Sequence, residues 1–174
     1  MADRIRVLLT EEEVDKRICE IADEVNKDYG MKPLHLICIL KGGVFFTCEL
    51  AKHLKMPVTM DFMAVSSYGA GTVSSGVVRI IKDLDEPIDG KDVLIVEDII
   101  DTGRTLAYLI EVLKGRHPKS IHLCTLLNKP ERRVKKQVHV DYTCFEIPDQ
   151  FVVGFGLDYD QKYRNLPYIG VVEV

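Results

Sequence analysis

Two adjacent acidic residues, Glu97 and Asp98, follow the apolar run 93–96. This run has the composition of a buried strand, which would deliver both carboxylates to the carboxyl end of that strand. Asp-Thr-Gly-Arg-Thr follows at 101–105, where a helix is predicted to begin. A helix start offers unpaired backbone N–H groups and the positive end of the helix dipole. Because Gly103 lets a ligand approach the backbone, the segment predicts a site for a phosphate monoester.

The two carboxylates are expected to bind a further group, because their negative charges would otherwise repel a phosphate bound beside them. Binding ribose hydroxyls, or a Mg²⁺ ion that offsets the charge, is such a task. Taken one residue at a time, the same segment also suits a strand end with solvated acids and an Asp or Thr helix cap. Only the combination of these residue types favours a ligand site.

Other polar segments also follow predicted strands. Residues 41–43, Lys-Gly-Gly, come after the apolar run 34–40 and suit either a tight turn or an anion loop built from backbone N–H groups. Lys129 follows another apolar run, where a lysine is usually a solvated cap, and the basic side chains at 132–136 are interpreted as a solvated face. The segment 66–76 is rich in Gly and Ser, cannot bury itself and is predicted to be a mobile loop.

Hydrophobic periodicity predicts alternating strands and helices. A helix at 14–25 follows a capping box at 10–13, and two more helices are expected at 44–54 and 106–115. Strands are expected at 34–40, 58–65, 77–81, 93–96, 120–127, 139–145, 152–155 and 168–172. This order predicts an α/β fold with a mostly parallel sheet flanked by helices. Because ligands bind beyond the carboxyl ends of such strands, the polar segments are expected to meet at one edge of the sheet.

Composition narrows the class of protein. The chain has 174 residues, of which 47% are hydrophobic, enough for the core of one domain. A formal net charge of −4 argues against the broad basic face of a nucleic-acid-binding protein. No apolar segment approaches the ~20 residues of a membrane span, and no signal peptide is recognised, so a cytoplasmic location is expected. Five cysteines without a Cys-x-x-Cys pair are interpreted as buried, reduced core thiols.

The segment 93–106 resembles the motif with which type I phosphoribosyltransferases bind phosphoribosyl pyrophosphate (PRPP). Its form, Glu-Asp-Ile-Ile-Asp-Thr-Gly-Arg-Thr, is similar to that of the hypoxanthine–guanine phosphoribosyltransferases, and the resemblance covers nearly the whole chain. It implies one domain over 1–174, with a small hood built from both chain ends and Mg²⁺ as cofactor. It also implies purine salvage: transfer of a phosphoribosyl group to hypoxanthine or guanine, with release of pyrophosphate, by a homodimer or homotetramer.

The resemblance also implies roles for individual residues. Asp101 would lie near N7 of the purine as general base or acid. PRPP would be bound by Lys41, Gly42, Gly43, Glu97, Asp98, Thr102, Gly103, Thr105 and Arg164. The purine would be bound by Lys129 at its C6 oxygen, by stacking on Phe151 and by the backbone of Val152. The metal would be bound by Glu97, Asp98 and Asp158. A loop over 66–77, beginning with Ser67 and Tyr68, would close over the site, and the peptide before Lys41 can be cis in this family.

Two other functions remain open. PRPP-fold regulators that bind RNA have a non-acidic residue where Asp101 stands and use a basic face, so Asp101 and the net charge argue against this class. An orotate or adenine phosphoribosyltransferase is the other alternative, and the segment 129–158 argues against it because that segment fits a 6-oxopurine. Recognition at C2 of the base is expected to use backbone carbonyls, so the sequence carries no signal for hypoxanthine, guanine or xanthine.

Overall fold

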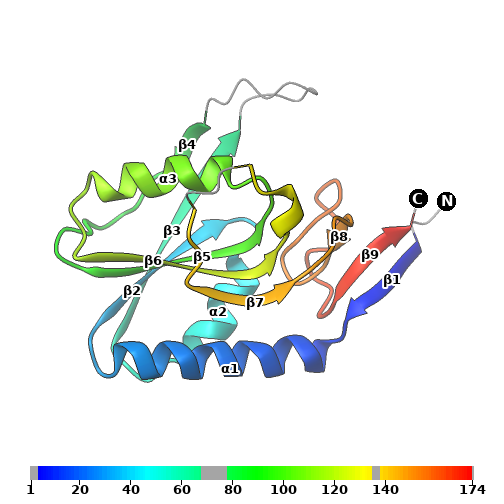
Figure 1. Cartoon of the computed structure of the whole chain (residues 1–174), viewed down its shortest axis with the longest axis horizontal. Coiled ribbons are helices and arrows are strands. Elements are labelled where there is room, and N and C mark those ends of the chain that lie inside the picture. The colour runs from blue at the N-terminus through cyan, green and yellow to red at the C-terminus, as the bar shows by residue number, and fades with distance from the viewer. Residues whose placement is uncertain (1–3, 68–77, 135–137, 174) are drawn as a thin grey trace.

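The computed structural model describes residues 4–67, 78–134 and 138–173 (Figure 1). The elements are β1 (Arg4–Leu9), α1 (Glu11–Tyr29), β2 (Leu34–Leu40), α2 (Val44–His53), β3 (Val58–Ser67), β4 (Val78–Lys82), β5 (Asp92–Ile100), α3 (Arg104–Lys114), β6 (Ser120–Asn128), the 3₁₀ turn η1 (Pro130–Arg132), β7 (Tyr142–Glu146), β8 (Val152–Val153) and β9 (Ile169–Glu173). Among them, no helix is long and apolar enough to cross a membrane.

Six strands form the central sheet in the order β4-β3-β2-β5-β6-β7. The neighbouring strands β3, β2, β5, β6 and β7 pair in parallel, and the edge strand β4 is antiparallel to β3. Ile37 of β2 is level with Ile95 of β5, which is level with Leu123 of β6, so the strand ends lie at common edges. The strand β2 is buried over almost its whole length and β5 over 93–96, because helices cover both faces of these central strands. The predicted α/β class is confirmed.

Helices cover the two faces of this sheet, with α1 and α2 on one side and α3 on the other (Figure 1). The predicted capping box starts α1: Glu13 N donates to Thr10 Oγ1 (3.2 Å) and Thr10 N donates to Glu13 Oε2 (2.7 Å). Neighbouring side chains of β2 enter different cores, Leu36 with α1 and α2, and Ile37 with α3. The alternation of strand side chains therefore builds two apolar layers, one on each face of the sheet.

A second sheet, in the order β1-β9-β8, joins the two ends of the chain beside the main sheet (Figure 1). The strand β1 was not predicted. Its residues are largely exposed, Val7 to 47%, so the sequence carries little alternation between buried and exposed positions. Its pairing with β9, at the other end of the chain, specifies it instead.

Several predicted boundaries and burials need correction. β7 begins at Tyr142 rather than at 139, and β8 is shorter than predicted because Gly154 and Phe155 both have positive φ, which ends extended backbone. The expectation of buried thiols is confirmed for three cysteines and is wrong for two, since Cys48 is exposed and Cys19 is half-buried. The buried cysteines are Cys38, Cys124 and Cys144.

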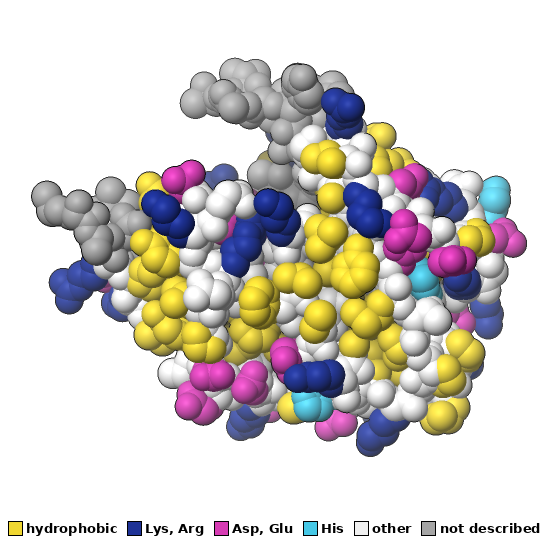
Figure 2. Space-filling model, turned by 180° about the vertical axis from the view of Figure 1, so that it is seen from behind, with side chains coloured by type: hydrophobic (Ala, Val, Ile, Leu, Met, Phe, Trp, Pro, Cys, Tyr) yellow, Lys and Arg dark blue, Asp and Glu magenta, His cyan; other side chains and the backbone are white. Residues whose placement is uncertain are grey.

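Figure 2 shows the molecule from behind. Hydrophobic side chains gather across the middle of this face, and charged side chains lie above and below them. Contiguous apolar surface of this kind is typical of a region that contacts another protein.

Candidate active site

The loops that follow β5, β6 and β7 are tied to one another at the carboxyl edge of the sheet. Lys129 N donates to Ile100 O (3.0 Å), and Ile147 N donates to Asn128 O (2.9 Å). These bonds join adjacent parallel strands just where each one ends. The polar segments singled out in the sequence therefore meet at one edge, as the predicted topology requires.

The loop between β5 and α3 forms a small cradle at a helix start. Gly103 is the N-cap of α3, and its φ of 75° is a conformation that a residue with a side chain rarely adopts. No side chain caps the helix, although Thr102 Oγ1 accepts from Arg104 N at 3.4 Å. A cavity of about 130 Å³ lies here, lined by Glu97 and residues 99–106, Thr105 among them. Free N–H groups at a helix start can hold a phosphate.

Glu97 and Asp98 lie half-buried beside this cradle. Their side chains accept from main-chain N–H groups, Glu97 from Asp98 N (3.2 Å) and Asp98 from Ile99 N (2.8 Å). Burial, and then the charge of Asp98, raise the pKa of Glu97 well above its usual value. Asp98 also lies against Gly42, where an added Cβ would be 1.6 Å from Asp98 Oδ2. Any side chain at 42 would therefore have to displace the Asp98 carboxylate, and the loop after β2 touches the acidic pair.

The acidic pair has hard oxygen ligands of the kind that Mg²⁺ prefers. No group of three or more His, Cys, Asp or Glu side chains in the described parts of the chain could hold a metal. Mg²⁺, however, usually keeps several waters and binds through one or two carboxylates together with substrate phosphates. Glu97 and Asp98 supply hard oxygen ligands next to the phosphate cradle, so they fit an ion that arrives with a phosphorylated ligand.

Lys41 and Arg164 are brought together by Gln161, which the sequence did not single out. Gln161 Oε1 accepts from Lys41 Nζ (3.1 Å) and from Arg164 Nη2 (3.2 Å). Asp158 completes the cluster, pairing with Arg164 Nη2 (2.9 Å) and accepting from Gln161 N (2.8 Å). Gln161 has a φ of 63°, a backbone feature that its residue type does not announce. Two cations thus converge on one point, where a polyanion could replace the amide oxygen.

The hood packs directly on the loop after β2. The peptide bond between Leu40 and Lys41 is cis, which the family resemblance had allowed. Gly156 has a φ of 101°, and a Cβ there would lie 2.0 Å from Gly42 O. Gly43 is similarly enclosed, since its Cβ would be 2.7 Å from Ile39 O. At Gly156 the hood and the loop approach too closely for a side chain, whereas Gly43 is enclosed by the backbone of the sheet itself.

Asp101 is paired with Arg132. Arg132 Nε donates to Asp101 Oδ1 (2.7 Å), and Arg132 Nη1 donates to Asp149 Oδ2 (3.1 Å). The largely buried Lys129 donates from Nζ to Gln150 O (2.7 Å) and lies 3.4 Å from Asp149 Oδ1. Arg132 belongs to the basic run interpreted as a solvated face. Its side chain is 45% exposed, and it also bridges two carboxylates.

Arg133, which is half-buried, departs from the interpretation as a solvated face. Its guanidinium donates to Asn128 Oδ1 and to Val138 O, and its Cδ would be 3.1 Å from a Cβ placed on Gly103. Val134 N donates to Thr102 O (3.1 Å) in the same region. This segment therefore packs against the loop that carries Thr102 and Gly103. Residue types alone could not show this, because the turn η1 decides where the arginines point.

Phe151 and Val152 lie at the start of β8, next to the partner of Lys129. Phe151 is 55% exposed and meets Tyr159 edge-on, with ring centroids 5.5 Å apart. Val152 is buried and pairs with Val171 of β9. An exposed aromatic ring on a fixed strand start can stack on a planar ligand.

The expected closing loop falls mostly outside the described residues. Ser66 and Ser67 belong to β3, where Ser67 pairs with Val78 of β4. Tyr68 and the rest of 68–77 are among the residues that the structure does not describe. Closure of this loop stays a prediction.

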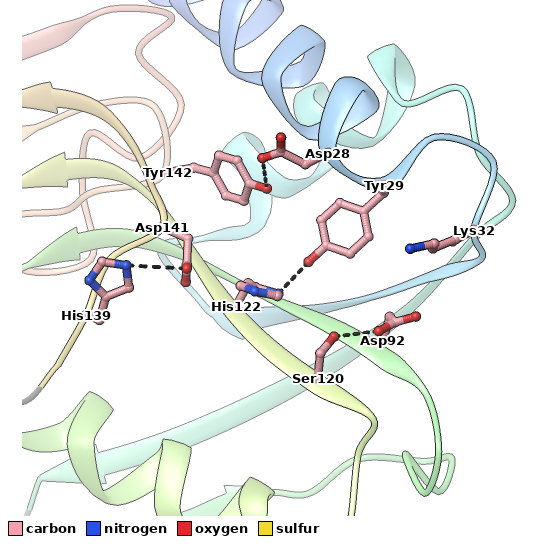
Figure 3. A pocket seen from close by; sticks show the side chains of 9 residues that line it. All are labelled: Asp28, Tyr29, Lys32, Asp92, Ser120, His122, His139, Asp141 and Tyr142. Carbon is pink, nitrogen blue, oxygen red and sulfur yellow. Dashed lines mark hydrogen bonds and ion pairs between the residues drawn. The ribbon is translucent and has the colours of Figure 1, made fainter.

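A larger cavity, about 430 Å³, lies at the opposite edge of the sheet (Figure 3). Its polar side chains bond to one another: Tyr29 Oη lies 2.7 Å from His122 Nδ1, and Tyr142 Oη donates to Asp28 Oδ2 (2.7 Å). It is reached from the amino ends of β5, β6 and β7, away from every site residue that the sequence predicted. The smaller cradle, and not this cavity, is the candidate active site.

Comparison with known proteins agrees with this placement. The phosphoribosyl transferase domain family matches residues 8–160. This chain belongs to the phosphoribosyltransferase family. The phosphoribosyltransferase is 51% identical to a hypoxanthine-guanine phosphoribosyltransferase of Streptococcus thermophilus over 97% of this chain and 93% of the relative, and it has the same identity and coverage with that of Bacillus subtilis.

Solved structures show the same fold. A hypoxanthine-guanine phosphoribosyltransferase from Bacillus anthracis superposes on this phosphoribosyltransferase with a TM-score of 0.93 at 43% identity, covering 98% of this chain and 100% of that one. A hypoxanthine phosphoribosyltransferase from Staphylococcus aureus gives a TM-score of 0.92 at 49% identity, covering 97% and 91%. The hood and the sheet edge thus belong to a fold shared with these enzymes.

Proposed function

We propose that this phosphoribosyltransferase transfers the phosphoribosyl group of PRPP to N9 of a 6-oxopurine, hypoxanthine or guanine, in purine salvage. One observation carries the proposal. The end of β5 and the loop that joins it to α3 carry two carboxylates, Asp101 and a helix-start cradle in sequence, and Lys129 follows the neighbouring strand β6. Relatives about half identical to this chain are named as hypoxanthine-guanine phosphoribosyltransferases, which supports the choice of base.

In this proposal the residues from Thr102 to Thr105 bind the 5′-phosphate through N–H and hydroxyl groups. Glu97 and Asp98 accept hydrogen bonds from the ribose hydroxyls and are ligands of Mg²⁺, with Asp158 helping to hold the metal and pyrophosphate. Bound Mg²⁺ would offset the charge of the pyrophosphate and so make it a better leaving group. A pyrophosphate ligand would draw Lys41 and Arg164 away from Gln161, and the backbone of Gly42 and Gly43 would bind the same group.

The purine site lies at the other end of the ribose. Lys129 turns from Gln150 O to donate to the oxygen at C6, and Phe151 stacks on the ring while the backbone of Val152 contacts its edge. As the bond between N9 and C1 of the ribose forms, the bond from C1 to pyrophosphate breaks. Asp101 accepts the proton that the purine loses at N7, so no covalent enzyme intermediate is needed.

Three broader expectations accompany this activity. The loop 66–77 closes over bound PRPP and excludes water, which would hydrolyse the activated ribose. The apolar face in Figure 2 supports assembly as a homodimer or homotetramer. The enzyme works in the cytoplasm on small molecules.

The proposal is tested by a spectrophotometric assay of hypoxanthine, guanine, xanthine and adenine with PRPP and Mg²⁺. Nucleoside monophosphate should form from at least one 6-oxopurine, and adenine should be a poor substrate. Transfer to adenine at a comparable rate, or no transfer to any 6-oxopurine, would refute it.

A further inference from the structure

A continuous line of charges crosses the purine end of the site. Arg132 donates from Nε to Asp101 and from Nη1 to Asp149, and the other oxygen of Asp149 faces Lys129 Nζ at 3.4 Å. Three segments meet here: the loop after β5, the turn η1 and the approach to β8. Two anions and two cations balance, so the line carries no net charge.

We propose that Arg132 is a positioning residue for the purine site, which holds the carboxylate of Asp101 and, through Asp149, the segment that carries Phe151. This inference rests on the proposed function, since it assigns Asp101 and Phe151 to the purine. It adds two residues, Arg132 and Asp149, to which neither the motif nor the relatives' names give a role.

Asp149 is the shared partner that makes this coupling work. The hydrogen bond from Arg132, followed by contact with Lys129, lowers the pKa of Asp149, so this carboxylate is ionised at neutral pH. Hydrogen bonds from Arg132 to Asp149 and Asp101 raise the pKa of the guanidinium. When Lys129 donates to a purine oxygen instead, Asp149 loses its contact with Lys129 but keeps its hydrogen bond from Arg132. Arg132 therefore stops Asp149 from following Lys129 and keeps Phe151, two residues on, in its stacking position.

The guanidinium is suited to this task by its shape. Arg132 uses Nε for Asp101 and Nη1 for Asp149, two donors set at a fixed angle in one plane. A lysine ammonium is a single point of charge on a flexible stem and cannot set the separation of two carboxylates in the same way. Arg132→Lys should therefore keep the charge and lose most of the positioning.

The test uses Arg132→Gln, Arg132→Lys and Asp149→Asn, and the double variant of Gln and Asn, with steady-state kinetics for both substrates. Each single variant should lower kcat/KM for hypoxanthine about 10-fold, because small displacements at a reacting centre cost that order of rate. KM for PRPP should stay within about twofold, because its groups lie elsewhere. The double variant should be no worse than the poorer single one, since both break the same link.

Arg116→Gln is the matched control. It breaks a comparable part-exposed ion pair far from the site, in which Arg116 donates to Asp83 at 2.7 and 2.8 Å. It should leave kcat/KM for hypoxanthine and KM for PRPP unchanged. Equal losses for PRPP and hypoxanthine, multiplying losses in the double variant, full activity of Arg132→Lys, or wild-type kinetics throughout would each overturn the positioning role. If wild type and control use no 6-oxopurine at all, the proposed function itself has failed.

Discussion

Replacing Asp101 by Asn tests the proton-transfer role most directly. Asparagine has nearly the same size and keeps a carbonyl oxygen that can accept from Arg132 Nε, the donor that meets Asp101 at 2.7 Å. It cannot accept a proton from the purine. The substitution therefore removes the proposed chemistry and retains the contact.

The expected loss follows from the size of general acid–base catalysis, ~10²–10⁴-fold in kcat. Stability should change little. The helix α3 is capped at Gly103 without a side chain, so Asp101 is not its cap, and 43% of the Asp101 side chain is exposed. An exposed ion pair contributes little, so the melting temperature should move by less than about 4 °C.

The assay pairs steady-state kinetics with hypoxanthine against a calorimetric titration of PRPP and a melting curve. A large fall in kcat with nearly unchanged PRPP affinity and melting temperature is the expected result. A rate close to wild type would refute proton transfer by Asp101. The double variant of Asp101→Asn with Arg132→Gln then shows whether the residual rate still depends on the arginine.

The remaining predictions concern the ribose, pyrophosphate and base contacts. Gly42→Ala should weaken PRPP binding more than about 10-fold in a calorimetric titration, because the new Cβ would lie 1.6 Å from Asp98 Oδ2 and must displace that carboxylate. Gly115→Ala is the control and should bind PRPP normally, because its Cβ meets nothing closer than 3.4 Å. Glu97→Gln should raise the melting temperature more at about pH 8 than at about pH 5. The pKa of Glu97 in the folded protein is raised above 4.5, so the wild type is stabilised by protonation at low pH and loses that stability as the pH rises. Glutamine does not titrate, so the variant shows no such loss. A difference in melting temperature that shrinks as the pH rises would contradict the raised pKa. Lys129→Ala should raise KM for hypoxanthine about 10- to 100-fold and weaken discrimination against adenine, because the site loses a charged donor. A variant that rejects adenine as strongly as the wild type would count against a contact between Lys129 and the C6 oxygen.

Much of the central sheet could be predicted because its signals are local. The apolar runs of β2 and β5 and the capping box of α1 each lie within a short stretch of chain, and the alternation of strands and helices permits few topologies. The hood as a unit was expected only through the family resemblance, although the strands β8 and β9 were predicted from their apolar residues. The strand β1 depends on pairing with β9, and its exposed and half-buried residues carry no clear periodic signal.

The same distinction applies to the candidate site. The sequence alone determined which residues stand between β5 and α3, and the backbone of a strand end and helix start then places the cradle beside Glu97 and Asp98. Only the tertiary structure decided that Arg132 meets Asp101 and that Gln161 joins Lys41 to Arg164.

The physical reason is the reach of the interactions. Hydrogen bonds within a turn or a helix start depend on neighbours along the chain, so residue type and spacing predict them. The direction of a long, charged side chain on a surface turn depends on which carboxylate another segment brings within about 3 Å. The sequence predicted only a solvated side chain for Arg132, because its partners, Asp101 and Asp149, come from loops that only the folded sheet brings together.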